Sequence, residues 1–419
     1  MGAQLNVPAY YDLAEGDTFE LFRRGVVLAS DPYRYNWRVE CEKGAVFERK
    51  YGYTPAYGDR GEYPMVMSLE DDDGTVLDRR ETVLRVHAVP ASLAKPVNLL
   101  CVGDSLTSGG VWVSELARRL TGTGGTPAGL ALPGIRFYGG VPAAPGVFHE
   151  GYGGWTFESF NTDYQSARFW HVRTAQTLTA LDQHASYRDS RGGLWRVETP
   201  GAESKLVYMD GTPSDGPEGC LVWESGGTGQ ARALDILAAR RASGNPFWDE
   251  TRDAVDFRTW GKKVGADTVD LACVLLGWNS TLTPRERYFG SVRTFLANLR
   301  RTYPGCRVIL MGLQVPDIDG FGQSYGCMWN YMDKLRYVFE MDERYAEIAV
   351  EDPLTVSASL AGQFDTEYNM PREAFPANVR NPRPVERGTN GVHPAKEGYL
   401  QIADAFYRAV IPFLNSNSI

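Results

Sequence analysis

The sequence predicts an α/β protein in which a small all-β module precedes a three-layer α/β/α domain with a mainly parallel sheet. Two observations support this prediction. Only strand and turn patterns fill the chain up to about residue 90, and apolar strand-like runs alternate with amphipathic helix-like segments after residue 96. A chain of 419 residues also has room for more than one domain of about 100 to 200 residues. We therefore expect a β-sandwich module over residues 1–92 and a second domain over residues 96–419.

The strands expected in the N-terminal module are apolar or alternating runs bounded by turn residues. They cover residues 19–22, 25–29, 35–41, 65–69 and 82–86. Residues 71–74, three aspartates and a glycine, are typical of a hairpin turn between the last two strands. An immunoglobulin-like sandwich is the expected arrangement. Residues 90–96 begin and end with proline and are expected to be a linker, because proline cannot donate to a sheet.

The second domain shows the alternation that is typical of a mainly parallel sheet covered by helices. The expected strands cover residues 97–102, 134–138, 268–276, 306–313 and 347–350, and the expected helices cover residues 111–120, 285–302, 329–345 and 396–414. Residues 160–262 interrupt this pattern with strand-like pieces at 194–199 and 205–209. We interpret them as an insertion that flanks the site and contributes substrate walls.

Charge and composition limit the classes of partner. The formal net charge is −9, whereas nucleic acids and anionic membranes are held mainly by clustered Lys and Arg. No apolar stretch approaches the roughly 18 residues of a membrane span. We expect a neutral substrate, with no nucleic acid and no membrane as partner, and the sequence leaves the oligomeric state open. Ten tryptophans and 22 tyrosines suit sugar stacking, although core packing accounts for them equally well.

The cysteines and the N-terminus bear on cofactors and compartment. Six cysteines are scattered without a CxxC pair, and no histidine and carboxylate cluster has metal-ligand spacing. We therefore expect no disulfide framework, no metal and no cofactor. The first residues lack the basic segment and apolar run of a secretory signal. A cytoplasmic location is the default expectation, with a secreted or periplasmic location if a signal peptide was removed.

A serine follows the strand expected at residues 97–102. That strand leads into Gly103-Asp104-Ser105-Leu106. Because ligand sites in parallel sheets lie at the carboxyl ends of strands, a hydroxyl at this edge is a candidate nucleophile. Acyl transfer by serine also needs a base, a group that orients the base, and donors for the oxyanion of the tetrahedral intermediate.

Three further segments supply residue types that suit these roles. Residues 151–156 form a glycine-rich turn, where a backbone N–H can approach a ligand closely. Asn279 follows the strand expected at residues 268–276 and is a neutral donor suited to an oxyanion. His393 lies in a loop before the last helix, with a proline after it. Each segment alone also has an ordinary structural explanation, as a tight turn, a helix cap or a loop residue.

Taken in order, the four segments resemble the conserved segments of the GDSL or SGNH hydrolase family of serine esterases, over residues 97 to 414. The resemblance implies an SGNH-type domain in which Ser105 is the nucleophile and His393 the general base. It also implies an oxyanion hole formed by the Ser105 N–H, the Gly154 N–H and the Asn279 side chain.

The sequence departs from the family pattern at two positions. Ser280 follows Asn279 where the family usually has aspartate, and Asn390 stands where the family's Asp-x-x-His motif has its aspartate. An asparagine oxygen can accept the Nδ1–H of His393 but cannot balance an imidazolium, and the corresponding Asp to Asn change in a serine protease lowers turnover by about 10⁴. Three explanations stay open: Asn390 or a backbone carbonyl orients His393, a carboxylate such as Glu386 replaces the aspartate, or the protein is a weakened or non-catalytic relative. We favour Asn390 as the orienting group.

The preferred substrate is an O-acetyl ester on an oligo- or polysaccharide. A β-module before an SGNH domain, together with abundant aromatic residues, resembles carbohydrate O-acetylesterases. Trp155 and Trp278 stand beside the expected oxyanion donors and either line the acyl or sugar subsite or pack the sheet edge. The alternatives are a lipid or thioester acyl hydrolase of the same family, and a catalytically weakened glycan-binding protein.

Overall fold

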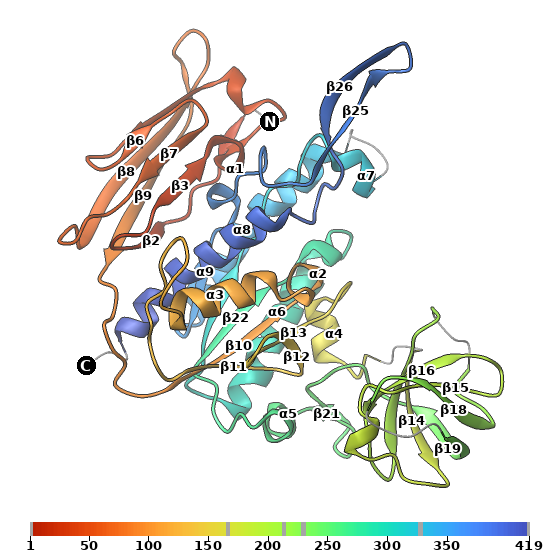
Figure 1. Ribbon diagram of the computed structural model, residues 1–419. Coiled ribbons are helices and arrows are strands. Elements are labelled where there is room, and N and C mark those ends of the chain that lie inside the picture. Colours follow the sequence, from red (N-terminus) through yellow and green to blue (C-terminus); the bar gives the residue numbers. More distant parts are fainter. Residues whose placement is uncertain (1–2, 165–167, 212–214, 228–231, 326–329, 417–419) are drawn as a thin grey trace. The chain divides into compact units, whose positions relative to one another are not determined.

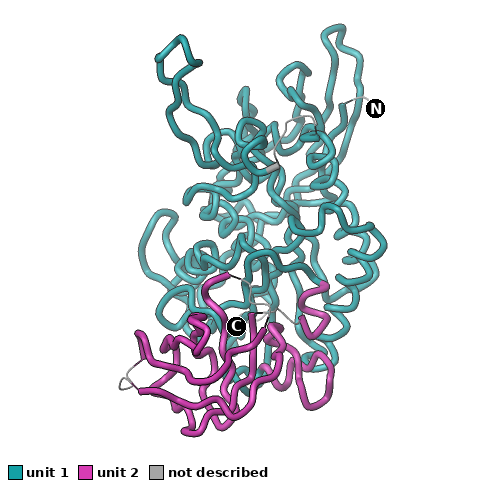
Figure 2. The backbone as a smooth tube through the Cα atoms, turned by 90° about the vertical axis from the view of Figure 1, so that its right-hand side faces the viewer, with its two compact units in different colours: residues 1–157, 261–419 teal, residues 158–260 magenta. Residues whose placement is uncertain are grey.

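The structure is a computed structural model, which describes residues 3–164, 168–211, 215–227, 232–325 and 330–416. The chain divides into two compact units (Figure 2). The first unit comprises residues 1–157 and 261–419, and the second comprises residues 158–260.

A seven-stranded sheet forms the centre of the first unit, in the order β12-β13-β11-β10-β22-β23-β24 (Figure 1). All neighbouring strands are parallel except β12 and β13. The strands are β10 (Val97–Gly103), β11 (Ile135–Tyr138), β12 (Val141–Ala144), β13 (Val147–Gly151), β22 (Leu271–Leu275), β23 (Arg307–Met311) and β24 (Thr355–Ala358). Nearly every residue of β10, β22 and β23 is buried, so both faces of the sheet are covered.

Two pairs of helices accompany this sheet. Helices α3 (Val111–Thr121) and α9 (Lys396–Asn415) contact each other, and Trp112 stacks on Phe406 with ring centroids 4.4 Å apart. Helices α6 (Arg285–Thr302) and α8 (Tyr331–Glu351) are joined by a hydrogen bond of 2.6 Å between the hydroxyls of Tyr288 and Tyr345. The first unit is therefore a mixed α/β fold. Trp329, where the sequence placed the start of α8, lies outside the described residues.

One expected strand is wrong. Residues 347–350 form the last turn of α8, and the fifth parallel strand is β24 instead. A short apolar run does not separate a strand from a helix by periodicity alone. Ile348 continues the buried positions Met341 and Tyr345 at helical spacing, whereas Val350 is 87% exposed. Similarly, the strand expected at 25–29 is only partly extended, because α1 (Arg23–Val26) ends within it.

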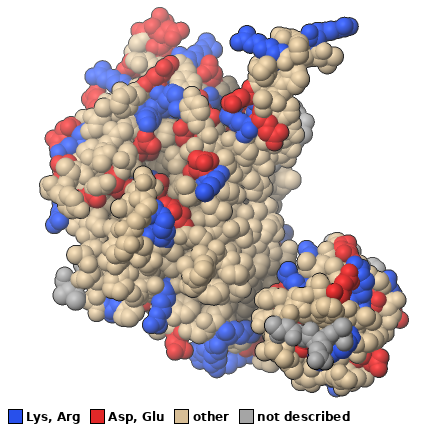
Figure 3. All heavy atoms as spheres, viewed as in Figure 1, with Lys and Arg blue, Asp and Glu red and all other residues tan. Residues whose placement is uncertain are grey.

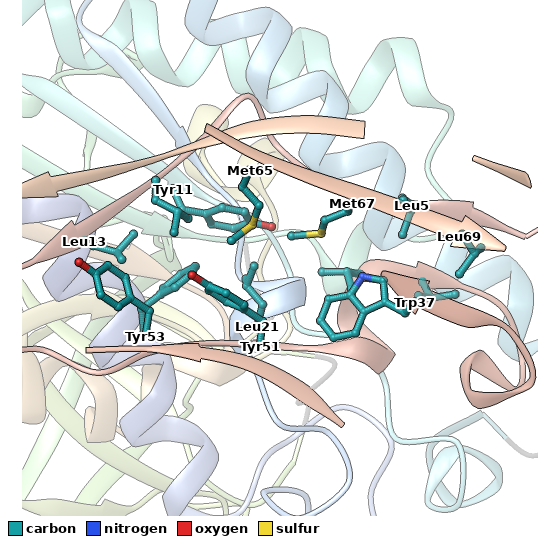
Figure 4. Packing of buried hydrophobic residues seen from close by; sticks show 14 of the residues in the cluster. Leu5, Tyr11, Leu13, Leu21, Trp37, Tyr51, Tyr53, Met65, Met67 and Leu69 are labelled. Atoms are coloured by element: carbon teal, nitrogen blue, oxygen red, sulfur yellow. The ribbon is translucent and has the colours of Figure 1, made fainter. Parts of the chain in front are cut away.

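The N-terminal residues form two sheets that share one apolar core (Figure 4). The four-stranded sheet β2-β9-β8-β5 packs against the three-stranded sheet β3-β7-β6, and β1 pairs with β4. These strands are β1 (Gln4–Leu5), β2 (Tyr10–Ala14), β3 (Phe19–Phe22), β4 (Val27–Leu28), β5 (Asn36–Glu40), β6 (Ala45–Val46), β7 (Lys50–Tyr53), β8 (Gly61–Glu70) and β9 (Val76–His87). Strands β8 and β9 form the expected hairpin around residues 71–74. Because β2 runs parallel to β9, the arrangement does not show an immunoglobulin-like topology.

Buried polar contacts join these N-terminal strands to the helices of the same unit. The Asp17 carboxylate binds Arg119 of α3 at 2.6 Å and Arg408 of α9 at 2.8 Å, and all three side chains are almost fully buried. The Asn6 amide donates to Asp342 of α8 at 2.8 Å. Breaking such a buried ion pair from one side leaves an uncompensated charge, so these contacts fix the N-terminal strands against the helices.

The second unit contains a closed barrel with the strand order β14-β17-β16-β15-β18-β19. Its strands are β14 (Phe169–Thr174), β15 (Ser186–Arg188), β16 (Leu194–Thr199), β17 (Ser204–Tyr208), β18 (Cys220–Ser225) and β19 (Ala233–Arg241). Buried apolar residues such as Tyr187 and Trp195 fill its core. The strand pattern at 194–199 matches β16, and that at 205–209 overlaps β17.

Short elements complete the described chain. These are β20 (Trp248–Asp249), β21 (Ala254–Val255), α4 (Phe157–Asn161), α5 (Phe257–Val264), α7 (Phe321–Tyr325) and the hairpin of β25 (Arg372–Asn378) and β26 (Asn381–Gly388). On the face drawn in Figure 3, acidic and basic residues are interspersed, and basic residues stand at the end of the β25–β26 hairpin. No helix of the described residues is long and apolar enough to cross a membrane.

Candidate active site

The candidate nucleophile stands at the junction of β10 with the short helix α2 (Ser105–Ser108). Asp104 caps this helix, because its Oδ1 accepts the N–H of Leu106 at 3.0 Å. A Cβ at Gly103 would lie 1.9 Å from Thr107 Oγ1, so only glycine fits where the strand turns into the helix. This tight turn places the Ser105 hydroxyl at the carboxyl edge of the sheet.

His393 meets Ser105 across a separation of 288 residues. Its Nε2 lies 2.8 Å from Ser105 Oγ. The loop that carries it is held from the segment after β23, since Gln314 Nε2 donates to Val392 O at 2.6 Å and the N–H of Asp317 donates to Gly391 O at 3.1 Å. Burial lowers the pKa of His393 below its usual value, which favours the neutral imidazole that can accept a proton. The structure thus brings together the two residues that the sequence placed at the centre of the site.

Asn390 contacts His393, but with the opposite polarity from the one expected. Its Oδ1 accepts the N–H groups of Val392 at 2.9 Å and His393 at 2.8 Å, so these two donors fix which side of the amide is oxygen. The remaining group, Nδ2, faces His393 Nδ1 at 3.4 Å. The asparagine oxygen therefore does not accept the Nδ1–H of His393.

This polarity affects the tautomer of the base. When the Asn390 amide donates to Nδ1, the imidazole proton resides on Nε2, which then donates to Ser105 Oγ. A general base needs the other tautomer, with Nε2 free to take the serine proton. Glu386 does not correct this arrangement, because it lies exposed on β26, opposite Ala374, and makes no contact with His393 in the described part of the chain.

The turn after β13 lies beside Ser105. Gly151 pairs with Gly103 of β10, the N–H of Tyr152 donates to Gly103 O at 3.0 Å, and a Cβ built on Gly153 would lie 4.0 Å from the Ser105 Cβ. Gly154 has φ +81°, a left-handed conformation that favours glycine. Within the described ranges, the N–H groups of Ser105 and Gly154 donate to no protein acceptor. Both N–H groups are thus available to a ligand.

Asn279 lies in the wall of the same site, on the 3-10 helix η3 (Trp278–Ser280). Its Nδ2 donates to Asp104 Oδ2 at 3.2 Å and to the carbonyl oxygen of Trp155 at 3.1 Å. Both hydrogens of the amide are therefore engaged, and an oxyanion would have to share one of them. Burial raises the pKa of Asp104 to about 7.

The two tryptophans are largely covered. Trp155 and Trp278 are each 5% exposed, and Trp155 stacks on Tyr152 with ring centroids 4.5 Å apart. This burial leaves little indole surface for a sugar ring and favours a packing role. In contrast, the sequence analysis missed Ser324 of α7, whose Oγ donates to Asn390 Oδ1 at 3.2 Å and accepts the Gly391 N–H at 2.9 Å. No motif surrounds Ser324, so only the folded chain identifies it.

The comparisons with known proteins give structural likenesses. No family model matches the sequence, and no curated protein matches it. Among solved structures, a family 3 carbohydrate esterase from Clostridium thermocellum has 14% identity and a TM-score of 0.38, and the match covers 77% of this chain and 98% of that one. A possible lipase from Chitinophaga pinensis has 11% identity and a TM-score of 0.36, with coverages of 76% and 98%. A carbohydrate acetylesterase from Sinorhizobium meliloti has 13% identity and a TM-score of 0.35, with coverages of 76% and 99%. At such identities and TM-scores these matches carry no argument about function.

Proposed function

We propose that the protein is an SGNH-type serine esterase that removes O-acetyl groups from carbohydrate. The single observation that supports it is the 2.8 Å contact between Ser105 Oγ and His393 Nε2 at the carboxyl edge of the parallel sheet. Nucleophile and base within hydrogen-bond reach are the signature of an activated serine.

The proposed reaction runs in two halves. In the tautomer of His393 that carries its proton on Nδ1, Ser105 Oγ attacks the acetyl carbonyl carbon while His393 Nε2 takes the serine proton, and His393 then protonates the departing sugar oxygen. Water, activated by the same histidine, attacks the acetyl-serine and releases acetate. In both halves the N–H groups of Ser105 and Gly154 bind the oxyanion, and Asn279 adds a shared amide hydrogen.

Two features of the site favour a small neutral ester. The proposed oxyanion donors are all uncharged, so they offer no fixed cation to an acidic substrate group. The flanking Trp155 and Trp278 are packed rather than open, so they offer little indole surface to a long acyl chain. Long acyl chains would call for an extended apolar groove.

The acyl preference can be measured directly. Hydrolysis of 4-nitrophenyl acetate should exceed hydrolysis of the octanoate ester, and Ser105→Ala should abolish both. A preference for octanoate would contradict the deacetylase proposal and favour a lipid or thioester hydrolase.

A second candidate function rests on the polarity of Asn390. Because an amide nitrogen faces His393 Nδ1, a glycan-binding protein with weakened catalysis is also compatible with the site. That reading predicts no ester hydrolysis above background, and glycan binding that Ser105→Ala leaves unchanged.

A further inference from the structure

The loop before α9 contains the only Asn-Gly dipeptide of the chain, Asn390-Gly391. In such a dipeptide the backbone nitrogen of the glycine can attack the asparagine side chain with little steric hindrance, because glycine has no Cβ. In this dipeptide the side-chain amide of Asn390 faces His393 Nδ1 and disfavours the tautomer of His393 that a general base needs. Replacing the amide with a carboxylate would remove this conflict.

We propose that Asn390 is a self-modification site, at which attack by the Gly391 nitrogen converts the asparagine to an aspartate. The modification itself does not depend on the function proposed above, whereas its effect on hydrolysis rests on that function.

The amide carbonyl of Asn390 is activated by its neighbours. Its Oδ1 accepts hydrogen bonds from the N–H groups of Val392 and His393 and from the Ser324 hydroxyl, at 2.9, 2.8 and 3.2 Å. Donors fixed on a carbonyl oxygen stabilise the negative charge that develops when its carbon is attacked. Ser324 Oγ also accepts the Gly391 N–H at 2.9 Å, so it is placed to take the proton that the attacking nitrogen must lose.

The leaving group must take up a proton. Asn390 Nδ2 lies 3.4 Å from His393 Nδ1, and because Nδ1 accepts this contact, the proton comes from solvent. The Gly391 nitrogen forms a bond to Asn390 Cγ, the bond from Cγ to Nδ2 breaks, and ammonia leaves. Ser324 passes the proton of Gly391 to solvent, and solvent supplies the proton that ammonia carries away. Water then opens the cyclic imide at Cγ, so that asparagine and water become aspartate and ammonia.

The product fits the site without a rearrangement of the loop. One carboxylate oxygen still accepts the hydrogen bonds from the N–H groups of Val392 and His393. The other takes the place of Nδ2 opposite His393 Nδ1. That oxygen accepts an Nδ1–H, which frees Nε2 to act as the base. Opening of the imide at the backbone carbonyl would instead give isoaspartate, whose extra main-chain carbon displaces His393.

Peptide mass spectrometry of the full chain tests the modification. Freshly purified protein is incubated in mildly alkaline buffer, and the amide-to-acid mass change at position 390 is followed against Asn279, which precedes Ser280 and serves as a reference in the same digest. Because aspartate and isoaspartate have the same mass, the two product peptides are separated by chromatography before the mass measurement. We expect position 390 to convert faster than position 279, with aspartate as the main product. Conversion no faster than at Asn279, or conversion mainly to isoaspartate, would overturn the proposal.

Two variants separate the role of the fold from that of the dipeptide. Ser324 is exposed, so Ser324→Ala should leave the fold intact while slowing the conversion several-fold. An unchanged rate in this variant would contradict the assisted mechanism. Asn390→Asp represents the finished product, so its mass at position 390 should not change with time.

Activity is followed in the same samples. If the proposed function holds, acetyl ester hydrolysis rises in step with the aspartate fraction, on the order of 10²-fold or more, toward the constant level of Asn390→Asp. If the mass change occurs but neither form hydrolyses esters, the esterase proposal fails while the modification stands. If the protein hydrolyses esters but its rate does not rise as aspartate forms, the proposed role of the modification is contradicted.

Discussion

Asn390 presents its amide nitrogen to Nδ1 of His393 at 3.4 Å, because its oxygen is held by the backbone N–H groups of residues 392 and 393. The two residues are three positions apart in the sequence, and a serine hydrolase needs an acceptor at Nδ1 of its histidine. The contact therefore stabilises the tautomer of His393 that donates to Ser105. It is the feature of the site on which the rate of any hydrolysis depends most.

Supplying that acceptor should raise activity. We expect Asn390→Asp to increase kcat for acetyl ester hydrolysis by about 10²- to 10⁴-fold over the unmodified chain, since loss of the carboxylate in a serine protease costs about 10⁴. Steady-state kinetics on protein confirmed by mass as unmodified makes the comparison. Asn390→Ala is the matched control and should gain nothing. Equal rates for the Asp and Asn forms would show that this position does not govern the base.

The pH profile should reveal the base. Burial lowers the pKa of His393 from its usual 6.5, so the neutral form persists to lower pH and the acid limb of kcat/KM should lie below pH 6.5. In Asn390→Asp the added negative charge favours the imidazolium, so the limb should move to higher pH. An acid limb that stays in place in Asn390→Asp would argue against contact between the two side chains in solution.

Two adjacent glycines provide a test of the oxyanion hole. Gly154→Ala puts a side chain on a residue with φ +81°, so the backbone should relax and turn its N–H, lowering kcat by about 10² or more. Gly153→Ala is the control, because its Cβ would lie 4.0 Å from the Ser105 Cβ, an ordinary contact. We expect Gly153→Ala to change KM more than kcat. Similar kcat losses in both variants would indicate general disruption of the turn.

The contribution of Asp342 to the free energy of unfolding should fall as pH rises toward neutrality. Burial raises the pKa of Asp342 to about 7 in the folded chain, from an ordinary value of 3.8. The contribution is thus fully present below pH 3.8 and is lost as pH rises toward about 7. Asp342→Asn resembles the protonated acid and keeps an oxygen for Asn6 and Ser359. Urea unfolding at several pH values should show a smaller decline in this variant than in the native chain, and an identical decline would contradict the assignment.

Local patterns predicted much of the fold, because the spacing of apolar residues along a segment reflects which of its side chains are buried. The helix expected at 285–302 has the same bounds as α6, and Ser105 and His393 meet as the four segments implied. Strand β2 pairs in parallel with β9, and the barrel is closed. Both features depend on contacts between residues far apart in the sequence, which no local run of residues encodes. The strand expected at residues 347–350 was wrong because a short apolar run fits a strand and a buried helix turn equally well.

The sequence indicates the residue types of the candidate site, but not which side of the Asn390 amide faces His393. The sequence shows that position 390 is an asparagine, yet which side of the amide faces His393 depends on two backbone N–H donors that exist only in the folded loop. Similarly, Asn279 is a plausible donor in sequence, whereas its contacts with Asp104 and Trp155 appear only when three strand ends meet. Ser324 had no motif at all, because its role depends on α7 lying against the His393 loop.

The most direct test of the account is acetate release from an acetylated oligosaccharide by the native chain, Ser105→Ala and His393→Ala, each shown to be folded by circular dichroism. We predict that the native chain releases acetate and that both variants fall to background, because the 2.8 Å contact places the proposed base against the proposed nucleophile. Release of acetate by Ser105→Ala at the native rate would contradict the central claim.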